Sequence, residues 1–334
     1  MNFDSVMKMR ELELESEEPL NTGSESDEDC DICENDEIDR LFTKCHLISE
    51  KRVASNKKYI LQIAATLDSS PNVALNLSNS TCEVYNLSNN QFAKLTVLSE
   101  HTDVISEVKF CKENNNLVYT GSNDGSVRLW DIRTPNKSIV QFKDTTIGDD
   151  TEVKQLNCFD VSPNNRLLAA GTNLFEGDAF ILFWDLRKHA LLGGYWECHT
   201  DDITQVKFHS NDSNKLISGS VDGLINVYDL SQTSEDDALT DTLNTESSVE
   251  KIGWLQQEGK DIISCITHTA DVQFWKLDNA QPYLHLHRFE IATQINVTEI
   301  GLLKTCTLLM YMQGGTTNLL LTGGEKGIVS AWDM

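Results

Sequence analysis

The sequence predicts an all-β protein assembled from copies of one short unit. The stretch TGSNDGSVRLWDIR, residues 120–133, recurs closely at residues 217–230 and 321–334. Each copy begins with the small and polar end of a strand-like segment, which is followed by turn residues. The apolar segment after the turn ends in Trp-Asp or Tyr-Asp. Short alternating or apolar runs between turn residues are typical of β-strands.

The clearest copy shows how one unit is built. Residues 105–110 (ISEVKF), 116–122 (NLVYTGS) and 126–131 (SVRLWD) are expected to form three successive strands. The dipeptides Asp124-Gly125 and Asp222-Gly223 predict hairpin turns of type I′, in which both central residues have positive φ. Near the beginning, residues 59–66 (YILQIAAT) are expected to form the first inner strand.

The repeat extends along the chain. Weaker copies occupy residues 76–87, 175–186 and 264–277. The intervals between the closing residues are 45, 54, 44, 47 and 57; these residues are Asn86, Asp131, Asp185, Asp229, Lys276 and Asp333. A period of about 40–45 residues with this ending is the signature of a β-propeller with four strands per blade. We expect seven blades, with one of them degenerate around residues 281–305; six blades is the alternative.

The ends of the chain suggest how the ring closes. Residue 334 follows directly on the third strand of a blade, which would leave a bare sheet edge. Residues 40–49 (RLFTKCHLIS) are extended and partly alternating, so we predict that this N-terminal strand completes the last blade and closes the ring. The domains expected are a disordered acidic segment at 1–39 and a propeller at 40–334.

These copies resemble the WD-repeat family of β-propellers, and motifs such as DAFILFWDLRK and TDDITQVKFH between residues 159 and 254 carry the resemblance. It implies a buried hydrogen-bond set of a loop His, a strand Ser or Thr, a turn Asp and a strand Trp in a blade. Because the set recurs whereas a catalytic site occurs once, we interpret it as structural and expect no enzyme. The two sets are His101, Ser122 (or Thr120), Asp124 and Trp130, and His199, Ser220 (or Ser218), Asp222 and Tyr228.

The charge of the chain is strongly negative, at −25, and the first 40 residues contribute 15 acidic against 3 basic residues. Such a segment is expected to be disordered. Ser24 and Ser26 each have an acidic residue three positions on and are candidate phosphosites. The segment is either an arm for basic proteins such as histones or a solubilising tail. Direct binding to nucleic acid is not expected, because the charges repel.

Two features indicate partner binding. The pattern Trp-Asp-x-Arg ends two successive units, at 130–133 and 184–187. In the WD-repeat family, paired copies contact the adaptor of cullin-4 ubiquitin ligases, which makes Arg133 and Arg187 candidate partner-binding residues; a local salt bridge is the alternative. Tyr195 and Trp196 are further candidates, although packing between blades explains them equally well.

Other functions find less support. Cys30-x-x-Cys33 followed by Cys45-His46 is a weak zinc signal, and we expect neither metal nor cofactor. There is no apolar run near the roughly 18 residues of a membrane helix, and no secretory signal, so we expect an intracellular protein of cytoplasm or nucleus. We therefore predict a non-enzymatic interaction scaffold, monomeric within complexes. The alternatives are a receptor of a cullin-4-type ligase and an acidic-arm binder of basic proteins.

Overall fold

The computed structural model describes residues 58–134, 137–146, 153–257 and 259–290, together with four strands outside them at 8–12, 308–311, 318–323 and 329–333. The chain divides into two compact units. The central unit is Lys51–Arg288, and the terminal unit combines Met1–Glu50 with Phe289–Met334. Each unit is described by itself.

The central unit holds five four-stranded antiparallel sheets, and in each the strands follow chain order. The first two sheets consist of β2 (Ile60–Ala65), β3 (Asn72–Leu77), β4 (Thr81–Ser88) and β5 (Gln91–Leu98), and of β6 (Ile105–Phe110), β7 (Leu117–Ser122), β8 (Ser126–Asp131) and β9 (Ser138–Lys143). The third consists of β10 (Leu156–Val161), β11 (Leu167–Thr172), β12 (Ala179–Asp185) and β13 (Ala190–His199).

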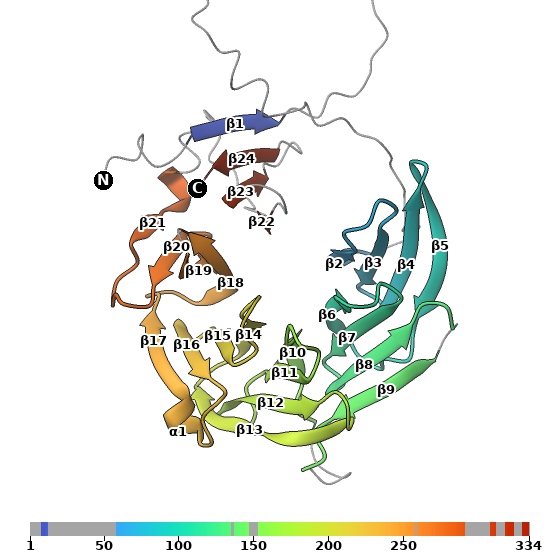
Figure 1. Ribbon diagram of the computed structural model, residues 1–334, viewed down its shortest axis with the longest axis horizontal. Helices are drawn as coiled ribbons and strands as arrows, with labels where there is room; N and C mark the ends of the chain where they lie inside the picture. The colour runs from blue at the N-terminus through green and yellow to red at the C-terminus, as the bar shows by residue number, and fades with distance from the viewer. Residues whose placement is uncertain are drawn as a thin grey trace, which may run out of the picture. The chain divides into compact units, whose positions relative to one another are not determined.

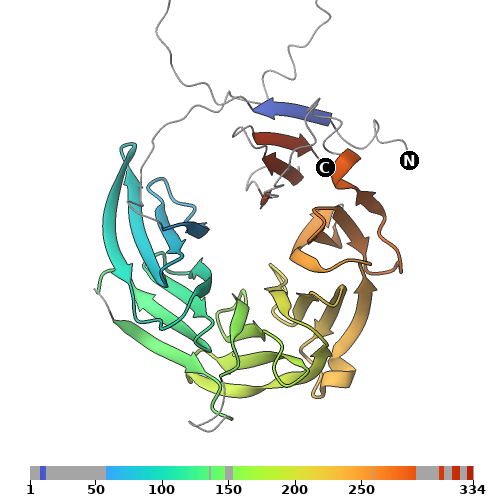
Figure 2. The same ribbon diagram turned by 180° about the vertical axis from the view of Figure 1, so that it is seen from behind.

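The fourth sheet consists of β14 (Ile203–Phe208), β15 (Lys215–Ser220), β16 (Leu224–Asp229) and β17 (Leu239–Asn244), with the short helix α1 (Glu235–Ala238) before β17. The fifth consists of β18 (Val249–Gln257), β19 (Lys260–Thr267), β20 (Val272–Lys276) and β21 (Leu284–Leu286). Within the central unit the sheets follow one another along an arc, with β2, β6, β10, β14 and β18 innermost (Figures 1 and 2). This is the arrangement of propeller blades, and the predicted all-β propeller fold is confirmed.

The core lies between neighbouring sheets. One cluster joins Val84 of the first sheet to Val118 and Trp130 of the second. Further clusters join the second sheet to the third, the third to the fourth, and the fourth to the fifth. Tyr228, in the fourth sheet, is 1% exposed, like the tryptophans at the equivalent places. It therefore fills the position of the family Trp without opening the core.

A glycine near the end of the second strand marks the closest approach between sheets. A Cβ on Gly121 would lie 2.7 Å from Cδ1 of Phe159, and one on Gly219 would lie 2.7 Å from Cγ1 of Val249. Phe159 and Val249 belong to the innermost strands of the following sheets. Since real Cβ atoms do not make such short contacts, packing between sheets requires glycine here, and this explains the Gly-Ser ending of the repeat.

The predicted type I′ turns are wrong. Gly125 and Gly223 have φ of 75° and 84°, but the aspartates before them do not have positive φ. The Gly125 N–H donates to the Ser122 carbonyl at 3.1 Å, and Ser122 pairs with Ser126 across the loop. The loop therefore has three residues: a type I turn followed by a left-handed glycine. This geometry lets the Asp124 carboxylate accept the Ser126 N–H at 3.0 Å.

The terminal unit forms one more four-stranded sheet, in the order β1-β24-β23-β22, from β1 (Lys8–Leu12), β22 (Leu308–Tyr311), β23 (Asn318–Gly323) and β24 (Val329–Asp333). An N-terminal strand completes this sheet, as predicted, but it is β1 and not residues 40–49, which lie outside the described residues. A strand added at an edge is held mainly by main-chain hydrogen bonds, so side-chain pattern discriminates poorly among candidates. Residues 8–12 of the segment expected to be disordered are thus a strand.

The described residues form six four-stranded sheets. The stretch in which a degenerate seventh blade was expected supplies β21, the outermost strand of the fifth sheet. Residues 291–307, the rest of that stretch and a little beyond, lie outside the described residues. Seven blades and ring closure stay predictions.

Candidate functional site

The loops of the central unit lie on two opposite faces, because successive connections of an antiparallel sheet leave from opposite ends. We call one the Arg face; it carries the loops from first to second and from third to fourth strands, including Arg133 and Arg187. We call the other the His face. It carries the loops from second to third strands and those that join consecutive sheets, including His101.

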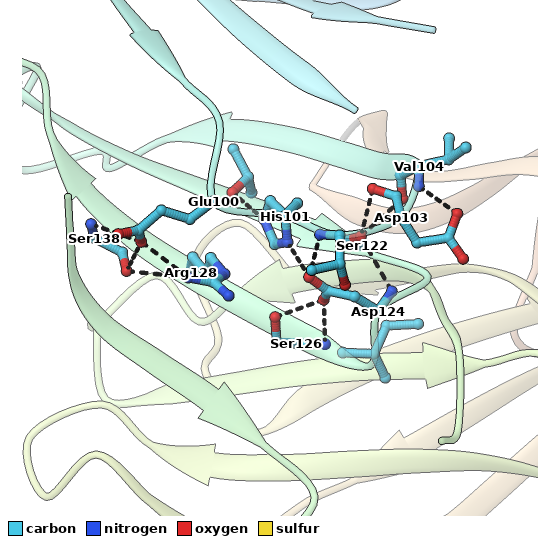
Figure 3. Close-up of polar contacts among 12 residues, drawn as sticks. Glu100, His101, Asp103, Val104, Ser122, Asp124, Ser126, Arg128 and Ser138 are labelled. Atoms are coloured by element: carbon cyan, nitrogen blue, oxygen red, sulfur yellow. Dashed lines mark hydrogen bonds and ion pairs between the residues drawn. The ribbon is translucent and has the colours of Figure 1, made fainter. Parts of the chain in front are cut away.

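On the His face, the second sheet contains a continuous chain of buried hydrogen bonds, of which Figure 3 shows the part from His101 to Asp124. His101 Nδ1 lies 2.8 Å from Asp124 Oδ2, and His101 Nε2 lies 2.7 Å from Thr120 Oγ1. Trp130 Nε1 donates to the same hydroxyl at 2.8 Å. Because the Asp124 carboxylate can only accept, Nδ1 carries a proton and donates to it, and in the neutral imidazole Nε2 then accepts from the Thr120 hydroxyl.

Ser122 is not part of this chain, contrary to the first choice made from the sequence. Its hydroxyl donates to the Val104 carbonyl at 2.9 Å and accepts the Asp124 N–H at 3.1 Å. Ser122 pairs with Ser126 at the turn, whereas Thr120 pairs with Arg128 two positions nearer to Trp130. Thr120 alone is therefore within reach of both rings, and Ser122 fixes the turn.

The fourth sheet repeats the arrangement. His199 Nδ1 lies 2.9 Å from Asp222 Oδ2, and Nε2 lies 2.7 Å from Ser218 Oγ. Tyr228 occupies the place of Trp130 by strand register, and its hydroxyl accepts a hydrogen bond from the Asn226 side-chain amide at 3.3 Å. Ser220 instead donates to the Asp201 carbonyl at 3.0 Å, so it too belongs to the turn. We call each such group a His–Asp brace.

The braces are built to hold loops in place. Burial alone would raise the pKa of Asp124, but hydrogen bonds from His101 and Ser126 outweigh it and lower the pKa to about 2. The pKa of Asp222 is lowered in the same way, with His199 as the main partner. Each carboxylate thus stays ionised and each imidazole is held at both nitrogens. Such satisfied networks rigidify a fold.

The third sheet carries a different arrangement around Lys154. This side chain is buried, and its Nζ donates to Asp144 Oδ2 at 2.8 Å. The ammonium also lies 5.0 Å from the ring centres of Phe180 and Trp196. Trp196 is nevertheless 39% exposed, so part of its ring faces solvent. A half-exposed Trp over a buried cation is a rigid apolar contact on the His face.

Tyr195 lies elsewhere. The centre of its ring lies 5.0 Å from the ring centre of Phe183 and 5.1 Å from that of Tyr228 in the fourth sheet. Burial raises the pKa of Tyr195 to about 12. Packing between sheets, the alternative considered from the sequence, accounts for this residue.

The His face is strongly acidic. In its described loops between 78 and 271, acidic side chains are opposed by a single Lys or Arg, Lys154, while Lys58 before β2 and Arg288 after β21 add two further basic residues at the ends of this face. The acidic residues are Glu100, Asp103, Asp124, Asp144, Glu176, Asp178, Asp201, Asp202, Asp222, Glu246 and Asp271. A surface of one sign raises the local concentration of oppositely charged partners.

On the Arg face, Arg133 and Arg187 occupy equivalent places in adjacent sheets. Each guanidinium folds back on the Asp two residues earlier: Arg133 Nη2 lies 2.6 Å from Asp131, and Arg187 Nη2 lies 3.1 Å from Asp185. These hydrogen bonds lower the pKa of both carboxyls to about 2. The arginine side chains remain 65% and 62% exposed, so the local salt bridges do not remove them from the surface.

The innermost strands are joined by a half-buried ionic network centred on buried Glu107. Glu107 lies 3.1 Å from Lys109 and 3.3 Å from Lys207, and Asp160 lies 2.8 Å from Lys109. Burial would raise the pKa of Glu107, but the charges of Lys109 and Lys207 outweigh it and lower the pKa. Glu107 and Asp160 also accept the backbone N–H groups of Phe159 and Phe208 at 2.8 Å. The network therefore ties β6, β10 and β14 together.

A cavity of about 480 Å³ opens where these innermost strands end on the Arg face. Its lining combines lysines with apolar and aromatic side chains, among them Lys109, Lys112, Lys207, Phe110, Phe208 and Trp254. A cavity of this size accepts a peptide side chain or a small ligand.

Ser24 and Ser26 lie outside the described residues, and their modification stays a prediction.

Among the described side chains, Asp271, His285 and His287 bring ligand atoms close enough to hold a metal ion, and this cluster was not predicted from the sequence. The sequence signal for this cluster was His-x-His in an extended segment, since alternate residues of a strand share a face.

The buried cysteines Cys82, Cys158 and Cys265 are free thiols, and burial raises their pKa to about 12.

In the described part of the chain, no helix is long and apolar enough to span a membrane. Similarity to a solved structure supports the fold: a chain of the crystal structure of the mitotic checkpoint complex matches with a TM-score of 0.61 and 15% identity, over 84% of this chain and 76% of that one. At this identity the likeness concerns the fold alone.

Relatives in sequence are more informative. The chain is 32% identical to WD repeat-containing protein 89 homolog of Dictyostelium discoideum over 74% of its own length, and 29% identical to WD repeat-containing protein GTS1 of Arabidopsis thaliana over 69%. It spans 64% and 56% of the lengths of these two relatives. The predicted resemblance to the WD-repeat family, and within it to WD repeat-containing protein 89, is confirmed.

Two family models match as well. The WD domain, G-beta repeat, matches residues 92–131, and the β-propeller of the nucleolar protein 10-like, N-terminal domain matches residues 140–313, more than half of the chain. The chain therefore belongs to the WD-repeat β-propeller proteins, in the nucleolar protein 10-like, N-terminal domain family.

Proposed function

We propose that this protein is a non-enzymatic interaction scaffold whose His face binds basic protein segments. The observation that carries the proposal is the charge of that face, where the described loops between residues 78 and 271 hold eleven acidic side chains and one buried lysine. Complementary charge steers a partner and fixes its register. The acidic N-terminal segment, with 15 acidic residues in 40, carries charge of the same sign and would also attract a basic partner.

The rigidity of the face supports this function. The His–Asp braces hold the loops before the second and fourth sheets, with contacts of 2.7–2.9 Å. Loops fixed in advance lose little conformational entropy on binding. Trp196, half-exposed beside Lys154, would supply an apolar contact among the charges.

The test compares two variants of equal charge. One neutralises exposed residues of the His face, Asp103→Asn/Glu176→Gln/Glu246→Gln. The control neutralises exposed residues of the Arg face, Asp68→Asn/Glu113→Gln/Asp278→Asn. Binding of a fluorescent lysine- and arginine-rich peptide to the full chain is followed by anisotropy at low and at physiological salt.

The His-face variant should bind the peptide at least about threefold more weakly, because exposed charge pairs contribute about 0.2–1 kcal/mol each. Its affinity should also depend less on salt. The control should stay close to the wild type. An equal loss in both variants would show that only the net charge matters and would sink the proposal.

Receptor function in a cullin-4-type ligase is the second candidate, favoured by the exposure of Arg133 and Arg187 at equivalent places in adjacent sheets. We expect an Arg133→Ala/Arg187→Ala variant to lose the ligase adaptor in affinity purification, while Arg166→Ala, on the same face, retains it. If the wild type recovers no adaptor, this candidate is excluded. The name of the matched family refers to a nucleolar protein, which supports a nuclear place of action.

A further inference from the structure

The fifth sheet carries a cluster of one carboxylate and two imidazoles that is unlike the braces of the second and fourth sheets. His285 and His287 are alternate residues at the outer strand β21, so they share a face of the sheet. Asp271 directly precedes Val272, which pairs with Leu286 between the two histidines. Topology alone therefore brings the three side chains together at the edge of the sheet.

The cluster is not a variant of a His–Asp brace. By strand register, Cys265 occupies the place of Ser218. Ser218 lies two residues before Ser220, which pairs with Ile203 at the start of β14. Cys265 likewise lies two residues before Thr267, which pairs with Val249 at the start of β18. Ala270 has φ of 64° and takes the place of Gly223, so Thr269 stands where Asp222 does. Asp271 is thus an additional carboxylate, and its two histidines follow the outer strand instead of preceding the innermost one.

The distances suit a metal ion. Asp271 Oδ2 lies 3.3 Å from His287 Nδ1 and 3.7 Å from His285 Nε2, and the three ligand atoms all lie within 4.8 Å of one another. A tetrahedral ion with bonds of about 2.0–2.1 Å separates its ligand atoms by about 3.3–3.4 Å. Two of the three separations are therefore already close to those of a bound ion.

The carboxylate is held in place from outside the cluster. Asp271 Oδ1 accepts the Arg288 N–H at 2.9 Å, and the Asp271 N–H donates to Thr267 Oγ1 at 3.2 Å. Oδ2 faces the two imidazoles and also accepts the Thr269 hydroxyl at 3.3 Å. Such outer hydrogen bonds orient the ligands of metal sites. Gln273, on the same face, is engaged elsewhere, since it donates to the Thr245 carbonyl at 3.0 Å.

We propose that Asp271, His285 and His287 bind a divalent transition-metal ion such as Zn²⁺. Two imidazoles and one carboxylate are ligands that such ions accept. The histidine side chains are 34% and 44% exposed, so a fourth position faces solvent and is open to water or to a side chain of a partner. The site lies on the His face, but it stands independently of the proposed binding of basic segments.

The test is calorimetric titration of the full chain with Zn²⁺. A Cys30→Ser/Cys33→Ser background removes the CxxC pair, which is a zinc candidate in its own right. We expect one ion per chain at micromolar Zn²⁺, with affinity reduced about tenfold or more by His285→Gln and by His287→Gln. His268→Gln is the matched control, because His268 is exposed in the same turn as Asp271 but lies outside the cluster.

A second readout guards against misfolding. Zn²⁺ should raise the unfolding temperature of the background protein and of His268→Gln, but not of His285→Gln. In a chelator all variants should unfold at the same temperature. Absence of stoichiometric binding in the background protein, or an equal loss in His268→Gln, would overturn the proposal.

Discussion

The Thr120 hydroxyl is the centre of the brace in the second sheet, and its removal should be costly. Thr120→Val keeps the shape of the side chain and deletes only the hydroxyl. Trp130 Nε1 and His101 Nε2 would then lose a partner at 2.8 and 2.7 Å. Both residues are buried, at 1% and 7% exposure, so water does not readily replace the lost contacts.

The expected loss can be worked from these two groups. An unpaired buried polar group costs about 1–3 kcal/mol, so two of them should lower the free energy of unfolding by about 2–6 kcal/mol. Thr120→Ser retains the hydroxyl and loses one methyl group, so it should cost only about 1 kcal/mol. The difference between the two variants isolates the hydroxyl from packing.

Equilibrium unfolding in urea, followed by tryptophan fluorescence, measures both changes. Thr134→Val is the control, since Thr134 is exposed and its hydroxyl donates only to the Asp131 carbonyl. It should change stability by no more than about 0.5 kcal/mol. If Thr120→Val loses less than Thr120→Ser, the hydroxyl does not bridge the two rings and the brace has been misread.

Three other predictions concern the framework. Because the pKa of Asp124 is lowered to about 2 from 3.8, its ionised form adds stability above pH 4 that is lost as the pH falls from 4 to 2. Urea unfolding of Asp124→Asn across this range should show a shallower decline than the wild type, by up to about 2 kcal/mol. Lys207→Met removes one partner of buried Glu107 and should lower the free energy of unfolding by about 1–3 kcal/mol. Glu107→Gln/Lys207→Met should recover part of that loss, because it also removes the unpaired charge. Denaturant titration of both variants measures the two changes. Gly219→Ala places a methyl group against Val249 and should cost about 1–3 kcal/mol, seen as a lower unfolding temperature, whereas an unchanged temperature would mean that the sheets can move apart freely.

The strands and the His–Asp pairs could be predicted from the sequence because both are local and repeated. Turn dipeptides, closing Trp-Asp pairs and loop histidines recur with a fixed spacing, and β6, β7 and β8 appear where the pattern places them. The choice between Thr120 and Ser122 could not be made in this way. These residues are two apart and share a face, so only the register against Trp130 separates them.

Features that depend on non-local pairing were missed for the same reason. Asp271 and His285 are brought together because β21 pairs with β20, but the surplus residues around β21 favoured a separate blade. Likewise, β1 pairs with β24 across almost the whole chain length, and an edge strand leaves little trace in its sequence. The acidic character of the His face requires knowing which loops share a side, which follows from blade topology and not from composition.

Departures from the repeat indicate where specific function is to be sought. In the third sheet Ala170 stands in the place of Thr120, by its pairing with Phe159, and Trp184 donates to the Lys143 carbonyl at 3.0 Å instead. The loops there are held by Lys154 and Asp144, with Trp196 left half-exposed. In the fifth sheet Cys265 and Thr269 replace the brace, and Asp271 meets two histidines. A loop that is not held by a His–Asp brace can carry residues selected for binding. Substitutions in the His-face loops of the third and fifth sheets should therefore alter binding while leaving the fold intact.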